Sequence, residues 1–153
     1  MQVNFLQGEL VYLTAEEPEV SSKCFALWNR DSEYYRLLDM DPVKLPSARQ
    51  IKDWMEKDMQ KEPPGEFFFF IRTLQDDRLI GFVGLGGVAW SHGDAWVGIG
   101  IGERDCWSNG YGTDAMRILL RYAFTELNLH RLTLGVFEYN PRAIRSYQKA
   151  GFS

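Results

Sequence analysis

The sequence predicts an α+β domain in which a mixed, mostly antiparallel sheet is flanked by helices. Residues with helical apolar spacing occupy both ends of the chain, and β-favouring residues with short turns occupy its middle. A further strand-like stretch stands between the last two helical stretches. At 153 residues the chain is expected to form one domain, residues 1–153.

The N-terminal half is predicted to contain one strand and two helices. Residues 9–14 are typical of a short strand, and residues 16–29 have helical spacing. Ser47 is a suitable N-cap for a second helix over residues 48–61. The residues expected to point inward from the two helices are Val20, Cys24, Leu27, Trp28, Ile51, Trp54, Met55 and Met59.

The C-terminal half is predicted to contain four strands and two helices. Short turns separate the first three strands, which are therefore expected to pair antiparallel. The first helix begins at Gly110 or Thr113, and the second has Asn140 and Pro141 at its start and Gly151 at its end. The predicted segments are strands 66–74, 78–90, 95–102 and 131–137 and helices 110–127 and 141–150.

The composition argues against several classes of protein. The net charge is −4, whereas general nucleic-acid-binding domains are basic. No apolar run approaches the roughly 20 residues that cross a membrane, and no signal peptide is visible. Cys24 and Cys106 share no metal-binding spacing, and two histidines cannot make a His-rich site. So few cysteines suit a reducing compartment, so we expect a cytoplasmic protein.

A glycine-rich stretch indicates an anion-binding site. Gly98, Gly100 and Gly102 alternate along one predicted strand, so a ligand or another segment must approach the bare backbone there. The following loop, residues 107–113, contains two more glycines and leads into a helix. Unpaired N–H groups and the dipole at a helix N-terminus favour a phosphate or pyrophosphate.

Two other interpretations of this loop stay open. The glycines could merely turn the chain. Gly110, Gly112 and Ala115 also fit the dinucleotide pattern G-x-G-x-x-A, but that pattern needs a tight turn directly after a strand of a βαβ unit. The P-loop pattern G-x-x-x-x-G-K-[ST] does not occur.

Two longer segments carry a resemblance to a known family. Residues 97–115 (VGIGIGERDCWSNGYGTDA) resemble motif A of the GNAT superfamily of N-acetyltransferases, and residues 140–152 (NPRAIRSYQKAGF) resemble its motif B. The branch they resemble most contains ribosomal-protein N-terminal (Rim-type) and spermidine acetyltransferases. The order of elements also agrees, so the resemblance extends over nearly the whole chain.

The resemblance implies acetyl-CoA as co-substrate and no metal. The backbone of Ile99 and Ile101 would pair with the pantetheine arm, residues 107–112 would wrap the pyrophosphate, and Thr113 would add a hydroxyl. Trp107 replaces the usual Gln or Arg of the family, so backbone N–H groups must carry more of the binding. The implied cofactor-binding residues are Ile99, Ile101, Trp107, Ser108, Asn109, Gly110, Tyr111, Gly112, Thr113, Asn140, Arg142 and Arg145.

Some of these residues have alternative roles. Asn140 would contact the cofactor, cap its helix, or do both. Arg142, Arg145 and Lys149 would face either the 3′-phosphate of CoA or solvent. Cys106, just before a helix N-terminus, would allow a covalent acetyl-cysteine route, although direct transfer in a ternary complex is the family norm.

The resemblance also implies two catalytic groups. Tyr147 would protonate the departing thiolate, because a phenol of pKa about 10 is protonated at pH 7; its alternative role is a packed core residue. A backbone N–H near Ile101 would stabilise the oxyanion. Close relatives have a glutamate base where this sequence has Trp96. The nearby Glu103 and Asp105 more simply suit a solvated loop, so no base is assigned.

The expected activity is acetyl transfer to the primary amine of a small molecule or a protein N-terminus. The alternative is a non-catalytic CoA-binding or regulatory module of the same fold. Four acids, Asp31, Glu33, Asp39 and Asp41, would either line an amine-attracting groove or form a solvated surface.

The sequence stops where the family continues with further strands, so we expect a C-terminally incomplete domain. Either the chain is a truncated version of a longer protein, or a partner completes the sheet. An exposed edge strand at residues 131–137 would be liable to pair with another chain, so a homodimer is possible.

Overall fold

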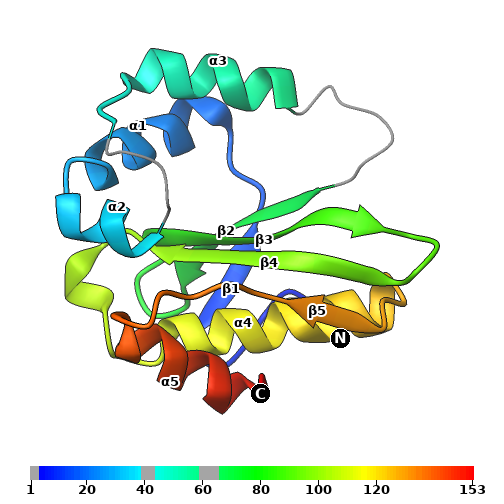
Figure 1. Ribbon diagram of the computed structural model, residues 1–153. Coiled ribbons are helices and arrows are strands. Elements are labelled where there is room, and N and C mark those ends of the chain that lie inside the picture. Colours follow the sequence, from blue (N-terminus) through cyan, green and yellow to red (C-terminus); the bar gives the residue numbers. More distant parts are fainter. Residues whose placement is uncertain (1–3, 39–43, 59–65) are drawn as a thin grey trace.

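In the computed structural model, which describes residues 4–38, 44–58 and 66–153, a five-stranded sheet lies between two layers of helices (Figure 1). The strands keep their sequence order across the sheet. The first four pair antiparallel and the fifth pairs parallel with the fourth, which confirms the predicted α+β class. The strands are β1 (Val11–Thr14), β2 (Phe67–Thr73), β3 (Leu79–Ala89), β4 (Asp94–Ile101) and β5 (Arg131–Thr133).

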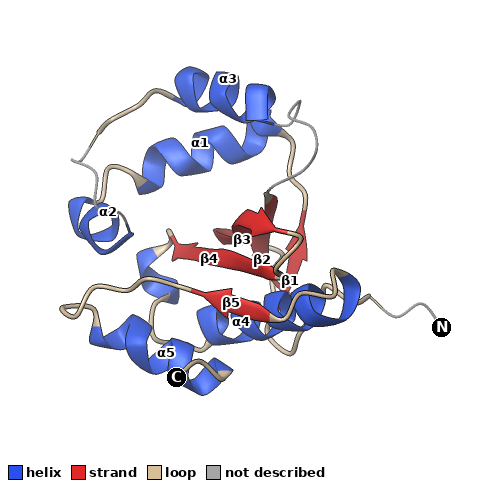
Figure 2. Ribbon diagram, turned by 45° about the vertical axis from the view of Figure 1, so that its right-hand side comes forward, coloured by secondary structure: helices blue, strands red, loops and turns tan. Residues whose placement is uncertain are grey.

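Helices cover both faces of the sheet. The first three lie on one face and the last two on the other (Figure 2). The long helix predicted after the glycine loop is α-helical at first and ends in a π-helical segment, η2. The helical elements are α1 (Pro18–Trp28), α2 (Ser32–Leu38), α3 (Ala48–Asp58), η1 (Arg104–Cys106, a 3-10 turn), α4 (Tyr111–Arg121), η2 (Tyr122–Glu126) and α5 (Pro141–Ala150).

The larger core lies between the sheet and α4. Ala115, Met116, Ile118 and Leu119 are all fully buried there against side chains of β1, β2 and β3. Burying one large apolar side chain contributes about 1.5–3 kcal/mol, so this face of α4 holds the helix firmly against the sheet. The glycine loop before α4 therefore starts from a fixed support.

The inward faces predicted for the first two helices are partly wrong. Val20, Leu27 and Trp54 are all largely exposed, whereas Ser21 is buried. The small Ser21 lets α3 approach α1 closely, and its Oγ lies 3.3 Å from the Sδ of Met55. Of the remaining predicted residues, those buried are Trp28, Ile51 and Met55, Cys24 is partly buried, and Met59 lies outside the described residues.

One helix, α2, was not predicted. Its seven residues are too few to display a clear apolar period. The Oδ1 of Asp31 accepts hydrogen bonds from the backbone N–H groups of Glu33 and Tyr34, both at 3.2 Å, and so caps the helix. Tyr34 is buried in a second, smaller core shared with α1, α3 and the sheet.

The last strand is shorter than predicted, and this creates the site. β5 covers Arg131–Thr133 instead of residues 131–137, and it pairs only with the first part of β4, from Asp94 to Trp96. Beyond Trp96 the two parallel strands diverge. The rest of β4 therefore has no strand beside it on that edge among the described residues.

Candidate active site

A cavity of about 850 Å³ lies where β4 and β5 diverge. Its walls come from β4, from the loop between η1 and α4, from α5, from the segment after β5, and from α2. Eleven of the twelve predicted cofactor-binding residues line it, the exception being Asn109. The structure thus brings the two motifs of the sequence to one place.

The backbone of β4 offers unused hydrogen-bonding groups to this cavity. The N–H of Gly102 donates to the carbonyl oxygen of Ile80 in β3 at 2.8 Å. Because backbone groups of successive residues point to opposite edges of a strand, those of Ile99 and Ile101 point away from β3. The Ile101 carbonyl oxygen already accepts from the Trp107 indole N–H, so the groups left for a ligand are the Ile101 N–H and the N–H and carbonyl of Ile99. An extended amide-containing chain would find its partners there, as expected for a pantetheine arm.

The three alternating glycines do two different things. A Cβ on Gly102 would overlap the Trp28 indole, and one on Gly100 would lie 2.6 Å from Phe82 Cε1. The lack of a Cβ at these two glycines leaves room for the neighbouring aromatic side chains. A Cβ on Gly98 would meet no atom within 4 Å, so Gly98 faces the open cavity, as a ligand-approach position should.

The start of α4 has the features expected of an anion site. Gly110 is the N-cap residue, with φ of 87°, and no side chain caps the helix. The first intrahelical bond runs from the Asp114 N–H to the Gly110 carbonyl, so the N–H groups of residues 111–113 have no helical acceptor. Three unpaired N–H groups and the helix dipole converge there on the cavity.

The acidic residue in this first turn is turned away from the cavity. Asp114 is buried, and its carboxylate accepts backbone hydrogen bonds from Glu9 at 3.2 Å, Leu10 at 2.8 Å and Val11 at 3.0 Å. Its negative charge is therefore directed at β1, on the opposite side of the helix start. The anion site keeps its positive character.

Two arginines flank the indole of Trp107. The Cζ of Arg142 lies 3.9 Å from the ring centroid and that of Arg104 lies 4.7 Å from it. The indole N–H donates to the carbonyl oxygen of Ile101 at 2.7 Å, so the ring is fixed against β4. Burial lowers the pKa of Arg142, which still leaves the guanidinium charged at neutral pH. Trp107 supplies no charge, but it orients a cationic neighbour into the cavity.

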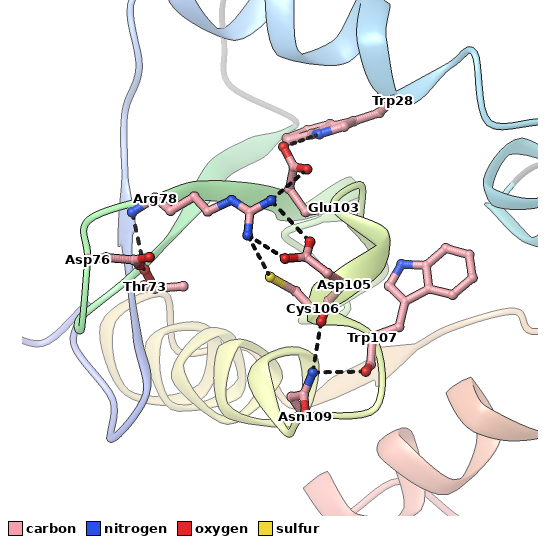
Figure 3. Close-up of polar contacts among 9 residues, drawn as sticks. All are labelled: Trp28, Thr73, Asp76, Arg78, Glu103, Asp105, Cys106, Trp107 and Asn109. Atoms are coloured by element: carbon pink, nitrogen blue, oxygen red, sulfur yellow. Dashed lines mark hydrogen bonds and ion pairs between the residues drawn. The ribbon is translucent and has the colours of Figure 1, made fainter.

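A polar network anchors the loop that leads into the anion site (Figure 3). The guanidinium of Arg78 bonds Asp105 at 2.7 Å and Glu103 at 3.0 Å, and Glu103 also accepts from the Trp28 indole at 3.1 Å. The side chain of Asn109 donates to the carbonyl oxygens of Asp105 and Trp107, both at 3.1 Å. Asn109 therefore shapes the loop from within it.

Three other predicted side chains line the cavity near the junction of α4 and α5, and two of them have hydrogen-bond partners. Asn140 is buried and accepts from the Ala143 N–H at 3.3 Å, so it caps α5 while also lining the cavity. The hydroxyls of Thr113 and Ser146 lie 2.7 Å apart. Arg145 is exposed at the cavity rim.

Tyr147 lines the cavity from α5. Its ring packs against the larger core and lies edge-on to Phe152, with centroids 6.4 Å apart. Burial raises the pKa of its phenol, and the nearby Arg142 lowers that pKa by a smaller amount. The group is thus a protonated donor at neutral pH. Its two expected roles, proton donor and core residue, are compatible in this position.

No carboxylate or histidine is found among the described residues that line the cavity. Trp96 is mostly exposed on β4, and Glu103 and Asp105 are held by Arg78. Burial raises the pKa of the Cys106 thiol, which opposes the formation of a reactive thiolate.

The acids near the first helices had two alternative roles, an amine-attracting groove or a solvated surface, and the two that are described are both paired with an arginine. Asp31 bonds Arg104 at 2.6 Å and Glu33 bonds it at 2.8 Å, so both charges are already paired. Asp39 and Asp41 lie outside the described residues. The pairing instead ties α2 to η1.

Sequence reasoning missed several of the described lining residues, and Tyr34 is the one among them whose polar atom is buried without a partner. Tyr34 lines the cavity from α2, and its side chain is almost fully buried. No motif contains it, and the short helix that carries it gave no periodic signal. Only the packing of α2 over β4 brings it to the cavity.

Within the described part of the chain, no group of three or more His, Cys, Asp or Glu residues is placed to hold a metal ion. None of the described helices has the length and apolar character needed to cross a bilayer.

Known proteins resemble this chain in sequence and in fold. The family model of the acetyltransferase (GNAT) domain matches residues 13–153. A Bacillus subtilis protein named "Probable N-acetyltransferase YjcK" is 31% identical over 155 residues, which cover 96% of this chain and 82% of that protein. "Uncharacterized N-acetyltransferase p20" of Bacillus licheniformis is 28% identical, with 95% and 83% covered.

Solved structures of acetyltransferases resemble this chain in fold. A chimera of Vibrio cholerae and human spermidine N-acetyltransferases has a TM-score of 0.79 and 26% identity, covering 95% of this chain and 81% of that one. The Vibrio cholerae spermidine N-acetyltransferase in complex with CoA and spermine has a TM-score of 0.81 and 24% identity, with 94% and 80% covered. The chain therefore belongs to the GNAT family and is an acetyl-CoA-dependent acetyltransferase.

Proposed function

We propose that this chain transfers the acetyl group of acetyl-CoA directly to a primary amine, of a small molecule or a protein N-terminus, in a ternary complex. The observation that carries this proposal is the combination of an unpaired β4 edge with an uncapped α4 N-terminus in one cavity. These features suit the two chemically different parts of acetyl-CoA, an amide-containing arm and a pyrophosphate.

The residues of the chain would divide the work as follows. The backbone of Ile99 holds the pantetheine arm. At Ile101 the carbonyl is bonded to an indole N–H, and the remaining N–H holds the thioester end of the cofactor by stabilising negative charge on its oxygen. The N–H groups at the start of α4 hold the pyrophosphate. Arg142 and Arg145 face the phosphates from α5. Tyr147 donates its proton to the departing thiolate.

The amine must reach the site neutral, or lose its proton to water. This follows from the lack of a carboxylate or histidine among the described lining residues. Turnover of acetyl-CoA with a panel of primary amines tests the proposal, and a chain that acetylates none of them would contradict it.

The first test is calorimetric binding of acetyl-CoA to the parent chain and to Gly110→Asp. A side chain at φ of 87° is strained, and the added carboxylate repels phosphate at the helix start, so affinity should fall at least about tenfold. Gly151→Asp is a matched control: it has φ of 115°, meets no atom within 4 Å, and lies at the far end of α5. If Gly110→Asp bound acetyl-CoA as tightly as Gly151→Asp does, the proposed phosphate site would be contradicted.

Two further parts of the proposal concern the setting of the protein. Both cysteines are free, which supports the expected reducing cytoplasm. β5 is an edge strand of the described sheet, which supports pairing with a second copy as a homodimer. One structural neighbour, a spermidine N-acetyltransferase from Vibrio cholerae, has itself been solved as a dodecamer.

A further inference from the structure

One residue that lines the cavity, Tyr34, carries a buried hydroxyl without a hydrogen-bond partner in the described part of the chain. Tyr34 is 3% exposed, and its Oη has no hydrogen-bond partner among the residues that the structure describes. A buried polar atom without a partner costs about 1–3 kcal/mol. Phenylalanine would fill the same space without this cost. The hydroxyl is therefore a group that folding alone does not explain.

The surroundings hold this hydroxyl over the centre of β4. A Cβ on Gly100 would lie 3.0 Å from Tyr34 Oη, so the bare glycine makes room for the phenol. Gly100 stands between Ile99 and Ile101, whose backbone groups point away from β3. Tyr34 also lines the cavity itself. Its Oη thus lies beside the part of β4 to which the reacting end of the acetyl donor is assigned.

The phenol is held there rigidly. Its ring belongs to the smaller core, and its backbone N–H is bonded to the capping Asp31. Asp31 is in turn paired with Arg104 of η1, next to the anion loop. Because the ring is packed and the backbone is bonded, the hydroxyl keeps one position and is preorganised to bind a ligand group.

We propose that Tyr34 Oη binds the acceptor amine, accepting a hydrogen bond from its N–H as the nitrogen lone pair approaches the acetyl carbon. This assignment rests on the proposed function. Tyr147 and Tyr34 enter the cavity from opposite sides, from α5 and α2, so they would serve opposite reactants: Tyr147 the leaving thiolate, Tyr34 the incoming amine. Burial raises the pKa of the Tyr34 phenol, so it stays protonated at neutral pH and does not act as the base. As the C–N bond forms and the C–S bond breaks, Tyr147 gives its proton to the thiolate, and the proton lost by the nitrogen returns through water to Tyr147.

The test compares Tyr34→Phe with the parent in three measurements. We expect kcat/KM for the amine to fall about tenfold, the loss that one hydrogen bond produces. The dissociation constant of acetyl-CoA should stay within about twofold. The melting temperature should stay level or rise, because an unpartnered hydroxyl is removed. Tyr12→Phe, which removes a hydroxyl bonded to Asp77 at the other edge of the sheet, should leave the amine kinetics unchanged.

Each other result has a defined meaning. Unchanged amine kinetics in Tyr34→Phe would overturn this assignment and leave the proposed function intact. So would an equal loss in acetyl-CoA affinity, or a clear drop in melting temperature, since these assign the hydroxyl to the cofactor or to the fold. A parent chain that binds acetyl-CoA but acetylates no amine would overturn the proposed function and this assignment together.

Discussion

Several single residues contribute to this site through their position and their contacts with neighbouring residues. Trp107 has no charge, yet its indole is bonded to Ile101 and carries Arg142 on its face. Gly98 contributes only empty space. Asn140 is a helix cap and a cavity wall at once. Roles such as these depend on placement more than on residue type.

The residue-scale prediction concerns Tyr147. Removing its hydroxyl in Tyr147→Phe should lower kcat by about 10²–10⁴-fold, the range for one general acid. The ring keeps its packing against Phe152, so acetyl-CoA affinity and melting temperature should change little. Steady-state kinetics with calorimetry measure both. A kcat within about threefold of the parent would leave Tyr147 only its core role.

At the scale of elements, α4 connects the core to the anion site. One face of the helix is buried against the sheet, and its N-terminal N–H groups open into the cavity. A second attachment is Asp114, whose carboxylate binds three successive N–H groups leading into β1. The position of the anion site therefore depends on β1, far away in sequence.

Asp114→Ala tests this attachment. The substitution leaves the buried N–H of Val11 and the part-buried N–H groups of Glu9 and Leu10 without their acceptor, so the free energy of unfolding should fall by about 3 kcal/mol. Urea titration of the parent and variant measures the change. Asp53→Ala, at an exposed position of α3, should change it by less than about 0.5 kcal/mol. If the two variants were equally stable, the N–H groups of β1 would have found other partners.

At the scale of the whole molecule, the cavity is a product of strand divergence. β4 and β5 pair over three residues and then separate, and helices from both faces of the sheet close the space between them. The lining contributes phenols, arginines and backbone groups. The described lining contributes no acid and no imidazole. The proposed mechanism therefore leaves proton removal to the acceptor and water.

The pH dependence of kcat/KM follows from this lining. The rising limb should track the pKa of the acceptor, near 8 for an α-amine and near 10.4 for a lysine-like amine. Burial raises the pKa of Tyr147, and only its protonated form donates, so the falling limb should begin above pH 10. Rates measured with two such acceptors check this. A rising limb at one fixed pH for both would reveal a base in the protein.

The sequence by itself determined the elements that carry strong local signals. The hairpin strands, the amphipathic helix after the glycine loop and the Asn-Pro start of α5 follow from period, turn and cap chemistry, which act over a few residues. The two motifs likewise predicted the cavity-lining positions, because glycines, unpaired N–H groups and a helix start are read from adjacent residues. Their roles in binding stay predictions.

Only the tertiary structure decided the rest. α2 is too short to show an apolar period. β5 ends after Thr133, where its pairing with β4 stops, and no residue pattern marks that point. Asp31 and Glu33 looked free in sequence, and Arg104 pairs with both. Tyr34 likewise lies at the cavity because of contacts between residues far apart in the sequence. Contacts between residues distant in the chain leave no local pattern, so only the folded chain reveals them.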